Sequence, residues 1–264
     1  MGSVKRKILD DLTQLEFTLS FGGQQLSVSV FLIDGLLIDT GPSKKKEELV
    51  SLLKDYDINE VILTHHHEDH TGAAHLIQED KKIPIYICES GIKNCEARMK
   101  LPLYRKVFWG EREPFQPQPL GNTHKSPSYT WDVIHTPGHA HDHIALYNRE
   151  KQWLFGGDLY VQSMPKSSFA FESIPIIIQS LRTMLTYDFE VYICSHAGII
   201  QNGRRAIERK LNYLVEIEQE VLSLHKDGMS RREIRKELFP KRHAMNYLSL
   251  FENSPQHIVN SILK

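Results

Sequence analysis

Residues 65–70 read His-His-His-Glu-Asp-His, and this hexapeptide places three imidazoles and one carboxylate at the spacing H-x-H-x-D-H. The three apolar residues directly before it predict a buried strand, so the polar cluster begins where a strand passes into a loop. Side chains alternate between faces along an extended backbone, which directs His65 and His67 to one point while Asp69 and His70 turn toward another. The hexapeptide can therefore contribute ligands to two neighbouring metal ions.

Three further polar residues follow predicted strands later in the chain. They are His139 in Thr-Pro-Gly-His, Asp158 in Gly-Gly-Asp and His196 in Ser-His-Ala-Gly. Glycines beside all three allow the sharp bends that bring a backbone close to an ion. Nitrogen and oxygen ligands of this kind suit Zn²⁺, and Fe or Mn would also accept them. Two sites can be filled: His65, His67 and His139 hold one ion, Asp69, His70 and His196 hold the other, and Asp158 gives one oxygen to each.

These motifs, together with Asp39-Thr40-Gly41, resemble the metallo-β-lactamase superfamily from residue 14 to about residue 200. The glyoxalase II-like branch is the most similar, and the β-lactamase-like protein 2 group is a second relative. The resemblance implies an α/β fold, a four-layer αββα sandwich with the dinuclear site at one edge between the two sheets. It also implies that Asp39 supports the ligand loops from behind.

The resemblance further implies a metallohydrolase mechanism. Two cations about 3.5–4 Å apart would bridge a water and lower its pKa toward about 7, which makes hydroxide available at neutral pH. Asp69 and Asp158 are the catalytic carboxylates in this interpretation. Tyr160, two residues after Asp158, is a candidate for stabilising the developing oxyanion, although it is equally suited to packing.

The chain divides into a predicted catalytic domain over residues 1–203 and a helical module over residues 204–264. Within the first part, residues 91–128 form an insert rich in proline and aromatic residues, which is typical of a lid or binding loop. The insert has seven Lys or Arg against three Glu, and the helical module has twelve Lys or Arg against eight Asp or Glu. Local positive charge therefore leaves an anionic small substrate and RNA open as partners. For the helices, a structural role or pairing with a second copy of the chain is favoured over contact with nucleic acid.

Local sequence signals set several helix boundaries. Ser43 is expected to cap a helix that runs to about Tyr56. Ser230-Arg-Arg-Glu233 is a capping box, and Ser254-Pro255 is a cap with proline at the first helical position. A β-meander over the first forty residues precedes them, so strands and helices alternate as in an α/β protein.

The composition excludes several classes of protein. With 264 residues, 41% hydrophobic residues and a net charge of −1, the chain has no bulk preference for nucleic acid or anionic membranes. It has no apolar run that would cross a bilayer or serve as a signal peptide, so a cytoplasmic location and no membrane partner are expected. Its three cysteines lack C-x-x-C spacing and predict neither a disulfide framework nor a thiolate zinc site.

Other histidines and acids near the motifs have simpler interpretations. His66 and Glu68 should point away from the ions, and His143 is at most a supporting or substrate-side group. The leading function is hydrolysis of a small ester, thioester or lactone. The alternatives are a phosphodiesterase or endoribonuclease, a mononuclear iron enzyme resembling persulfide dioxygenases, and a non-catalytic DNA-binding protein in which the ions are structural.

Overall fold

Two mixed β-sheets form the centre of the fold, which the computed structural model describes for residues 4–241 and 243–264. The first sheet has the order β1-β2-β3-β4-β5-β6-β7, with strands Lys5–Leu9 (β1), Leu12–Phe21 (β2), Gln24–Ile33 (β3), Leu36–Ile38 (β4), Glu60–Ile62 (β5), Ile85–Ile87 (β6) and Gln118–Pro119 (β7). The second has the order β14-β13-β11-β10-β9-β8, with strands Thr123–Lys125 (β8), Thr130–His135 (β9), Ile144–Asn148 (β10), Trp153–Phe155 (β11), Val191–Cys194 (β13) and Gly198–Ile200 (β14).

The two sheets pack face to face through a dense apolar core. Phe31 and Ile62 from the first sheet meet Trp131 and Phe155 from the second in one buried cluster. The Phe155 ring lies edge-on to Phe31, with centroids 5.7 Å apart, and edge-on to Trp131 at 5.6 Å. Each such side chain stabilises the fold by about 1.5–3 kcal/mol through burial. This core fixes the relative position of the loops at the sheet edges.

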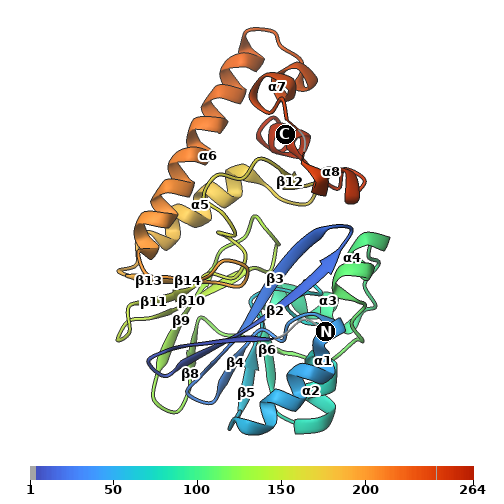
Figure 1. Cartoon of the computed structure of the whole chain (residues 1–264). Coiled ribbons are helices and arrows are strands. Elements are labelled where there is room, and N and C mark those ends of the chain that lie inside the picture. Colours follow the sequence, from blue (N-terminus) through green and yellow to red (C-terminus); the bar gives the residue numbers. More distant parts are fainter. Residues whose placement is uncertain (1–3, 242) are drawn as a thin grey trace.

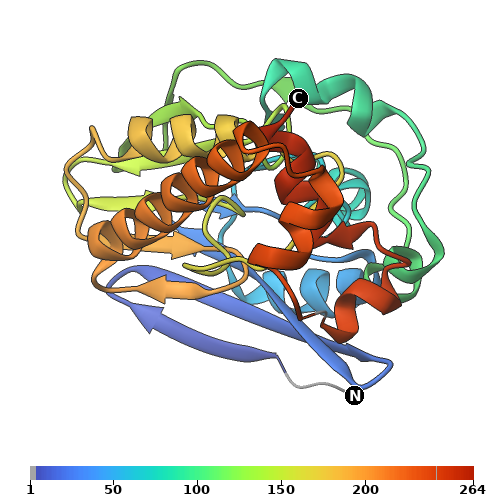
Figure 2. The same ribbon diagram turned by 90° about the horizontal axis from the view of Figure 1, so that it is seen from above.

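Helices cover the outer face of each sheet and complete a four-layer αββα sandwich (Figure 1). The first sheet is covered by short helices: Ser43–Lys45 (η1), Lys46–Leu52 (α1), Leu53–Asp55 (η2), Ala74–Lys81 (α2), Glu89–Gly91 (η3), Ile92–Glu96 (α3) and Leu103–Trp109 (α4). Ile174–Met184 (α5) and the long Gly203–Lys226 (α6) cover the second and lie side by side (Figure 2). The predicted fold class is confirmed.

The C-terminal helices lie above the edge of the sandwich that carries the ligand loops (Figure 1). They are Arg231–Leu238 (α7), Ala244–Leu248 (α8) and Pro255–Ile262 (α9). Ser230 forms the predicted capping box with Glu233, and Ser254 caps α9 ahead of Pro255. A small sheet joins Ser168–Phe169 (β12) to Asn253–Ser254 (β15), so these helices are tied to the segment after Asp158. The division of the chain at residue 203 stays a prediction.

Two segments differ in detail from the sequence-based expectation. The helix expected from Ser43 breaks into η1, α1 and η2, and Ser43 does not cap it, because its hydroxyl donates to the carbonyl oxygen of Glu111 at 2.7 Å. Residues 91–128 form α3 and α4 and then supply β7 to the first sheet and β8 to the second. The insert is therefore integrated into the sandwich as well as covering part of it.

The three cysteines are free thiols in the fold. Cys95 and Cys194 are buried free thiols and Cys88 is half-buried. Burial raises the pKa of Cys95 to about 12, which keeps this thiol protonated at neutral pH. In the part of the chain that the structure describes, no helix combines the length and hydropathy needed to cross a bilayer.

Candidate metal centre

The loops that carry the predicted ligands leave the sheets in a common direction. In the first sheet β4 and β5 are parallel, and in the second β11 is parallel to β13 and lies antiparallel to β10, which is antiparallel to β9. Strands that run the same way end at the same edge, which is where α/β folds place their sites. The loops after β4, β5, β9, β11 and β13 carry Asp39, residues 65–70, His139, Asp158 and His196.

Three imidazoles form the first cluster. His65 Nε2 lies 3.0 Å from His67 Nδ1, and His139 Nε2 lies 3.1 Å from the same atom. All three residues are buried. Tetrahedral zinc with Zn–N bonds of about 2.0–2.1 Å holds its nitrogen ligands about 3.3 Å apart. The spacing of these nitrogens therefore fits a single zinc-sized ion.

The second cluster combines Asp69, His70, Asp158 and His196. The Oδ2 atom of Asp158 lies 3.0 Å from His196 Nε2 and 3.3 Å from His70 Nε2. It also lies 3.6 Å from His139 Nε2 in the first cluster. Asp158 thus stands between the two groups, as the sequence pattern predicts for a carboxylate shared by two ions.

Two buried polar atoms of this cluster lack a hydrogen-bond partner among the described residues, and they are His70 Nε2 and Asp158 Oδ1. An unpaired buried polar atom costs about 1–3 kcal/mol, so native structures rarely keep one without a ligand or water. A divalent cation would satisfy both atoms. The donor set and its spacing fit the metal that the motif implies.

The outer ring nitrogens of four histidines are held by the protein. His70 Nδ1 lies 2.7 Å from Asp39 Oδ2, and His139 Nδ1 lies 2.7 Å from Glu172 Oε1. The remaining two contacts are His65 Nδ1 with Thr64 Oγ1 at 3.1 Å and His196 Nδ1 with the Ser27 carbonyl at 2.6 Å. These partners orient each ring, so that its other nitrogen is the one that would bind an ion.

Burial and neighbouring charges give the clusters opposite electrostatic character. Burial and the surrounding imidazoles hold the pKa of His65 and His67 well below the usual range, so both stay neutral and ready to bind a cation. Burial opposes charge on His70 and His196 as well, but the surrounding carboxylates together outweigh it and raise the pKa of both: Asp158, Asp39 and Asp69 act on His70, and Asp158 and Asp69 act on His196. A cation entering the second cluster therefore displaces protons from these two rings.

Two glycines allow the ligand loops to approach so closely. Gly157 has φ +48° and faces His143 Nε2, which would be only 2.6 Å from an added Cβ. Gly138 has φ +124° and packs against the backbone of Ile177, whose nitrogen would be 2.7 Å from a Cβ. A side chain at either position would displace Asp158 or His139.

Residues assigned other roles from the sequence lie outside the two clusters. His66 Nδ1 pairs with Asp142 Oδ1 at 2.7 Å. Glu68 is fully buried and binds Arg105 of the insert. His143 Nε2 accepts the Asp158 backbone N–H at 3.1 Å, which is a supporting position and agrees with the prediction.

A cavity of about 470 Å³ opens onto both clusters. The insert forms one wall with Tyr104, Arg105, Phe108 and Trp109, so this segment does border the site. The Phe171 ring covers the first cluster, 5.2 Å from His67 between centroids, and Trp109 lies 6.1 Å from His196. Tyr160 lines the cavity and packs against Tyr192 at 5.8 Å. The oxyanion role of Tyr160 stays a prediction.

The sequence patterns did not point to several residues that support the centre. Glu172 holds His139 but stands 33 positions away, in a segment without a recognisable motif. Lys210 is buried and donates to the carbonyls of Leu159 and Tyr160 at 2.7 and 2.6 Å. For Lys210 the sequence did offer a signal, because a lysine falls on the apolar side of the predicted helix.

The model of the metallo-beta-lactamase superfamily matches residues 23–196, which contain every predicted ligand. The chain belongs to this superfamily. A lactamase-like protein of Pestalotiopsis microspora is 32% identical over 192 residues, covering 71% of this chain and 53% of that protein. A thioesterase of Emericella nidulans is 28% identical over 205 residues, covering 75% of this chain and 53% of that protein. The chain thus spans about half the length of these two relatives.

Relatives of more similar length carry hydrolase names. A probable metallo-hydrolase of Bacillus subtilis is 26% identical over 261 residues, covering 81% of each chain. A hydroxyacylglutathione hydrolase of Haemophilus influenzae is 28% identical over 173 residues, covering 62% of this chain and 81% of that protein. The expected superfamily, with a glyoxalase II-like relative, is confirmed.

Solved structures agree in fold. A β-lactamase domain protein from Burkholderia ambifaria superimposes with a TM-score of 0.71 at 18% identity, covering 99% of this chain and 88% of that one. A metallo-β-lactamase family protein from Thermus thermophilus superimposes with a TM-score of 0.69 at 20% identity, covering 96% of this chain and 93% of that one. At such identities the likeness establishes the fold alone. The superposition extends over the C-terminal helices of this chain as well as the sandwich.

Proposed function

We propose that this protein is a dinuclear metal-dependent hydrolase of a small ester, thioester or lactone, with thioesters the first class to test. The observation that carries the proposal is the pair of donor clusters that border one cavity, with Asp158 of the second cluster 3.6 Å from His139 of the first. His65, His67 and His139 would hold one ion and Asp69, His70 and His196 the other. Zinc is the favoured metal because both sets are nitrogen and carboxylate donors. The relatives named as a thioesterase and as a hydroxyacylglutathione hydrolase support the same class.

Two divalent cations bound there would supply water of lowered pKa and polarise the substrate carbonyl. The protein itself excludes water from the site and orients the donor atoms. Phe171 and Trp109 flank the clusters and keep bulk water from the reacting carbonyl, which strengthens every charge interaction inside the cavity. Glu172 and Asp39 fix the rings of His139 and His70, so the donor atoms are already oriented when substrate arrives.

The charges that border the cavity favour an apolar acyl group. Three Lys or Arg side chains line the cavity: the Arg105 guanidinium is neutralised by Glu68, the Lys210 ammonium is directed to two backbone carbonyls, and the Lys166 ammonium donates to the Tyr213 hydroxyl. The remaining wall is rich in aromatic and aliphatic side chains, among them Phe108, Phe169 and Leu159. An uncharged aliphatic or aromatic acyl chain therefore fits this space better than a phosphate does.

Phosphodiester cleavage is the second candidate. A relative named beta-lactamase-like protein 2 homolog in Caenorhabditis elegans is 26% identical over 204 residues, and the C-terminal helices carry excess positive charge. One observation disfavours this candidate. Arg105 and Arg112 of the insert both donate hydrogen bonds inside the protein, so fewer positive charges are available to bind a polyanion than the composition suggests. Metal-dependent cleavage of single-stranded RNA, with its strong dependence on salt, would favour this candidate.

The test combines metal analysis with a matched pair of variants. The wild type is expected to bind two zinc ions per chain and to hydrolyse an acyl thioester, and Asp158→Asn is expected to lose at least about 100-fold in kcat/KM. Asp57→Asn, at an exposed carboxylate that precedes β5 and belongs to neither donor cluster nor the cavity lining, serves as the control and should retain full activity. Full thioesterase activity in Asp158→Asn, with the fold intact by circular dichroism, would exclude the proposed mechanism.

A further inference from the structure

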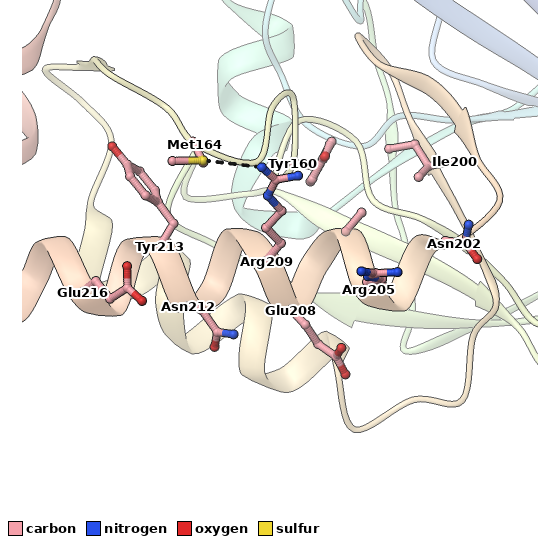
Figure 3. A pocket seen from close by; sticks show the side chains of 11 residues that line it. Tyr160, Met164, Ile200, Asn202, Arg205, Glu208, Arg209, Asn212, Tyr213 and Glu216 are labelled. Atoms are coloured by element: carbon pink, nitrogen blue, oxygen red, sulfur yellow. Dashed lines mark hydrogen bonds between the residues drawn. The ribbon is translucent and has the colours of Figure 1, made fainter.

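A second cavity lies beside the candidate metal centre, against helix α6 (Figure 3). It is open to solvent and has a volume of about 690 Å³, within the 300–1,000 Å³ typical of ligand pockets. One side is α6 itself, and the other is the loop over residues 160–164 that follows Asp158. Tyr160 borders this cavity and also the catalytic one, so the two spaces are adjacent.

Two arginines one helical turn apart give this cavity its chemistry. Arg205 and Arg209 are exposed on α6, and Figure 3 shows Arg209 extending toward the loop. Among the residues that the structure describes, Arg209 contacts only the Met164 sulfur, at 3.8 Å, and Arg205 has no ion pair or hydrogen bond. The side-chain amides of Asn202 and Asn212 add further donors to the lining.

The carboxylates in the same lining do not cancel this charge. Glu208 lies 3.4 Å from Arg204, which is not part of the lining. Glu216 lies about two turns further along α6 from Arg209. Within the described part of the chain, neither of these two guanidinium groups has a carboxylate partner, and their planar forks match phosphate oxygens.

Helix α6 also fixes the loop that separates the two cavities. Lys210, the residue next to Arg209, donates to the Leu159 and Tyr160 carbonyls. The following residue, Val161, has φ +48°, a conformation that is strained for a β-branched side chain. The loop is thus held in one shape between the catalytic carboxylate and the arginines.

We propose that the α6 cavity binds the phosphate-bearing end of the thiol carrier whose thioester is cleaved at the metal centre. The proposal rests on the proposed function. In the reaction, water adds to the thioester carbonyl, the carbon–sulfur bond breaks, and the products are a carboxylate, a thiol and a proton. The two products need separate places: the acyl group occupies the aromatic cavity, and the thiol carrier passes Tyr160 to reach Arg205 and Arg209.

Such a carrier has two sources that share one chemistry. A phosphopantetheine arm ends in a phosphate both in coenzyme A and on a carrier protein. The test therefore uses one acyl group on three thiols: N-acetylcysteamine, 4′-phosphopantetheine and coenzyme A. The variant is Arg205→Gln combined with Arg209→Gln, and the control is Arg182→Gln, an exposed arginine of α5 that lines neither cavity.

The double variant is expected to raise KM by about 10- to 100-fold for phosphorylated thioesters, since it removes both charge-assisted contacts to the phosphate. KM for the N-acetylcysteamine thioester should not change, and Arg182→Gln should match the wild type throughout. An effect already present with phosphopantetheine assigns the site to the arm's own phosphate. An effect confined to coenzyme A assigns it to the nucleotide phosphates. An equal effect on all three thioesters, or none, overturns the proposal.

Direct binding separates this proposal from the proposed function. Coenzyme A is titrated calorimetrically into the zinc-loaded wild type and the double variant. If no thioester is hydrolysed but coenzyme A binding is lost in the double variant, the proposed function fails and the phosphate site stands. If coenzyme A does not bind and single-stranded RNA does, with Arg205 and Arg209 required, the site belongs to nucleic acid and the proposal is wrong.

Discussion

Arg105 and Glu68 form a buried, bidentate salt bridge that joins the insert to the ligand hexapeptide. Arg105 Nε lies 2.6 Å from Glu68 Oε1, and Nη2 lies 2.8 Å from Oε2. The same guanidinium lies 5.6 Å from the ring of Phe171, which packs on His67. One side chain of the insert therefore contacts both the loop that presents the ligands and the aromatic cover of the first cluster.

Replacing Arg105 with leucine should destabilise the protein strongly. Removing one partner of a buried ion pair leaves an uncompensated charge, and the expected loss in the free energy of unfolding is about 3–5 kcal/mol. Urea denaturation of the wild type and Arg105→Leu measures it. Lys106→Leu is the matched control, because Lys106 pairs with Glu111 on the surface and should cost less than about 1 kcal/mol. Similar losses in the two variants would contradict the assigned role of the buried pair.

Local patterns predict much of this site because the ligands follow strands directly. Alternation along an extended backbone accounts for His65 and His67, which the structure places in one cluster. Alternation alone would keep Asp69 on their side, but a turn over residues 68–70, in which the His67 carbonyl accepts the His70 backbone N–H, carries Asp69 and His70 to the second cluster. The strand Val191–Cys194 before His196 also agrees with its apolar pattern. Periodicity therefore predicts the strands and the pair of histidines, whereas the turn that divides the hexapeptide lies outside its reach.

Contacts between distant segments could not be predicted in the same way. Glu68 finds Arg105 37 positions later, and only the path of the insert brings them together. Ser43 has the local features of a helix cap, yet its hydroxyl reaches Glu111, 68 positions away. Tertiary packing decided both cases, because a buried carboxylate and a buried hydroxyl take whichever partner the fold supplies.

Asp39→Asn should weaken the second metal without affecting the first. Asp39 accepts from His70 Nδ1 at 2.7 Å and from the Thr64 backbone N–H at 2.8 Å. An amide removes the negative charge that orients His70, and comparable changes reduce metal affinity about 10- to 100-fold. Zinc titration against a competing chelator measures each affinity. Asp34→Asn is the control. Asp34 also has positive φ, but its carboxylate accepts the Ser128 backbone N–H and contacts none of the donor residues.

Glu172→Gln should have the opposite selectivity. Glu172 Oε1 holds His139 Nδ1 at 2.7 Å, while Oε2 accepts the Phe169 backbone N–H at 2.7 Å. Losing the carboxylate frees the His139 ring, so the first metal should bind at least about 10-fold more weakly and the second should be unchanged. The same chelator competition tests this. If Glu172→Gln and Asp39→Asn weaken the same ion, the assignment of partners to the two clusters is wrong.

Lys210 should make the stability of the protein depend on alkaline pH. Burial lowers the pKa of this lysine to about 8, against 10.5 for an ordinary lysine. Below pH 8 the side chain is protonated in both the folded and the unfolded states, so its unfavourable contribution is constant. Between pH 8 and 10.5 the folded protein has lost this proton while the unfolded chain retains it. The unfolded state then binds more protons, and stability rises with pH over this window.

Lys210→Met isolates the effect, because methionine fills a similar volume without a titratable group. The free energy of unfolding of the wild type minus that of Lys210→Met should increase by about 2 kcal/mol between pH 7.5 and pH 10. Urea denaturation at both pH values gives this difference, and the shared titration of all other groups cancels in the subtraction. A difference that stays constant, or falls as pH rises, would show that Lys210 keeps its ordinary pKa in the fold or that its charge is stabilised there by the carbonyls of Leu159 and Tyr160.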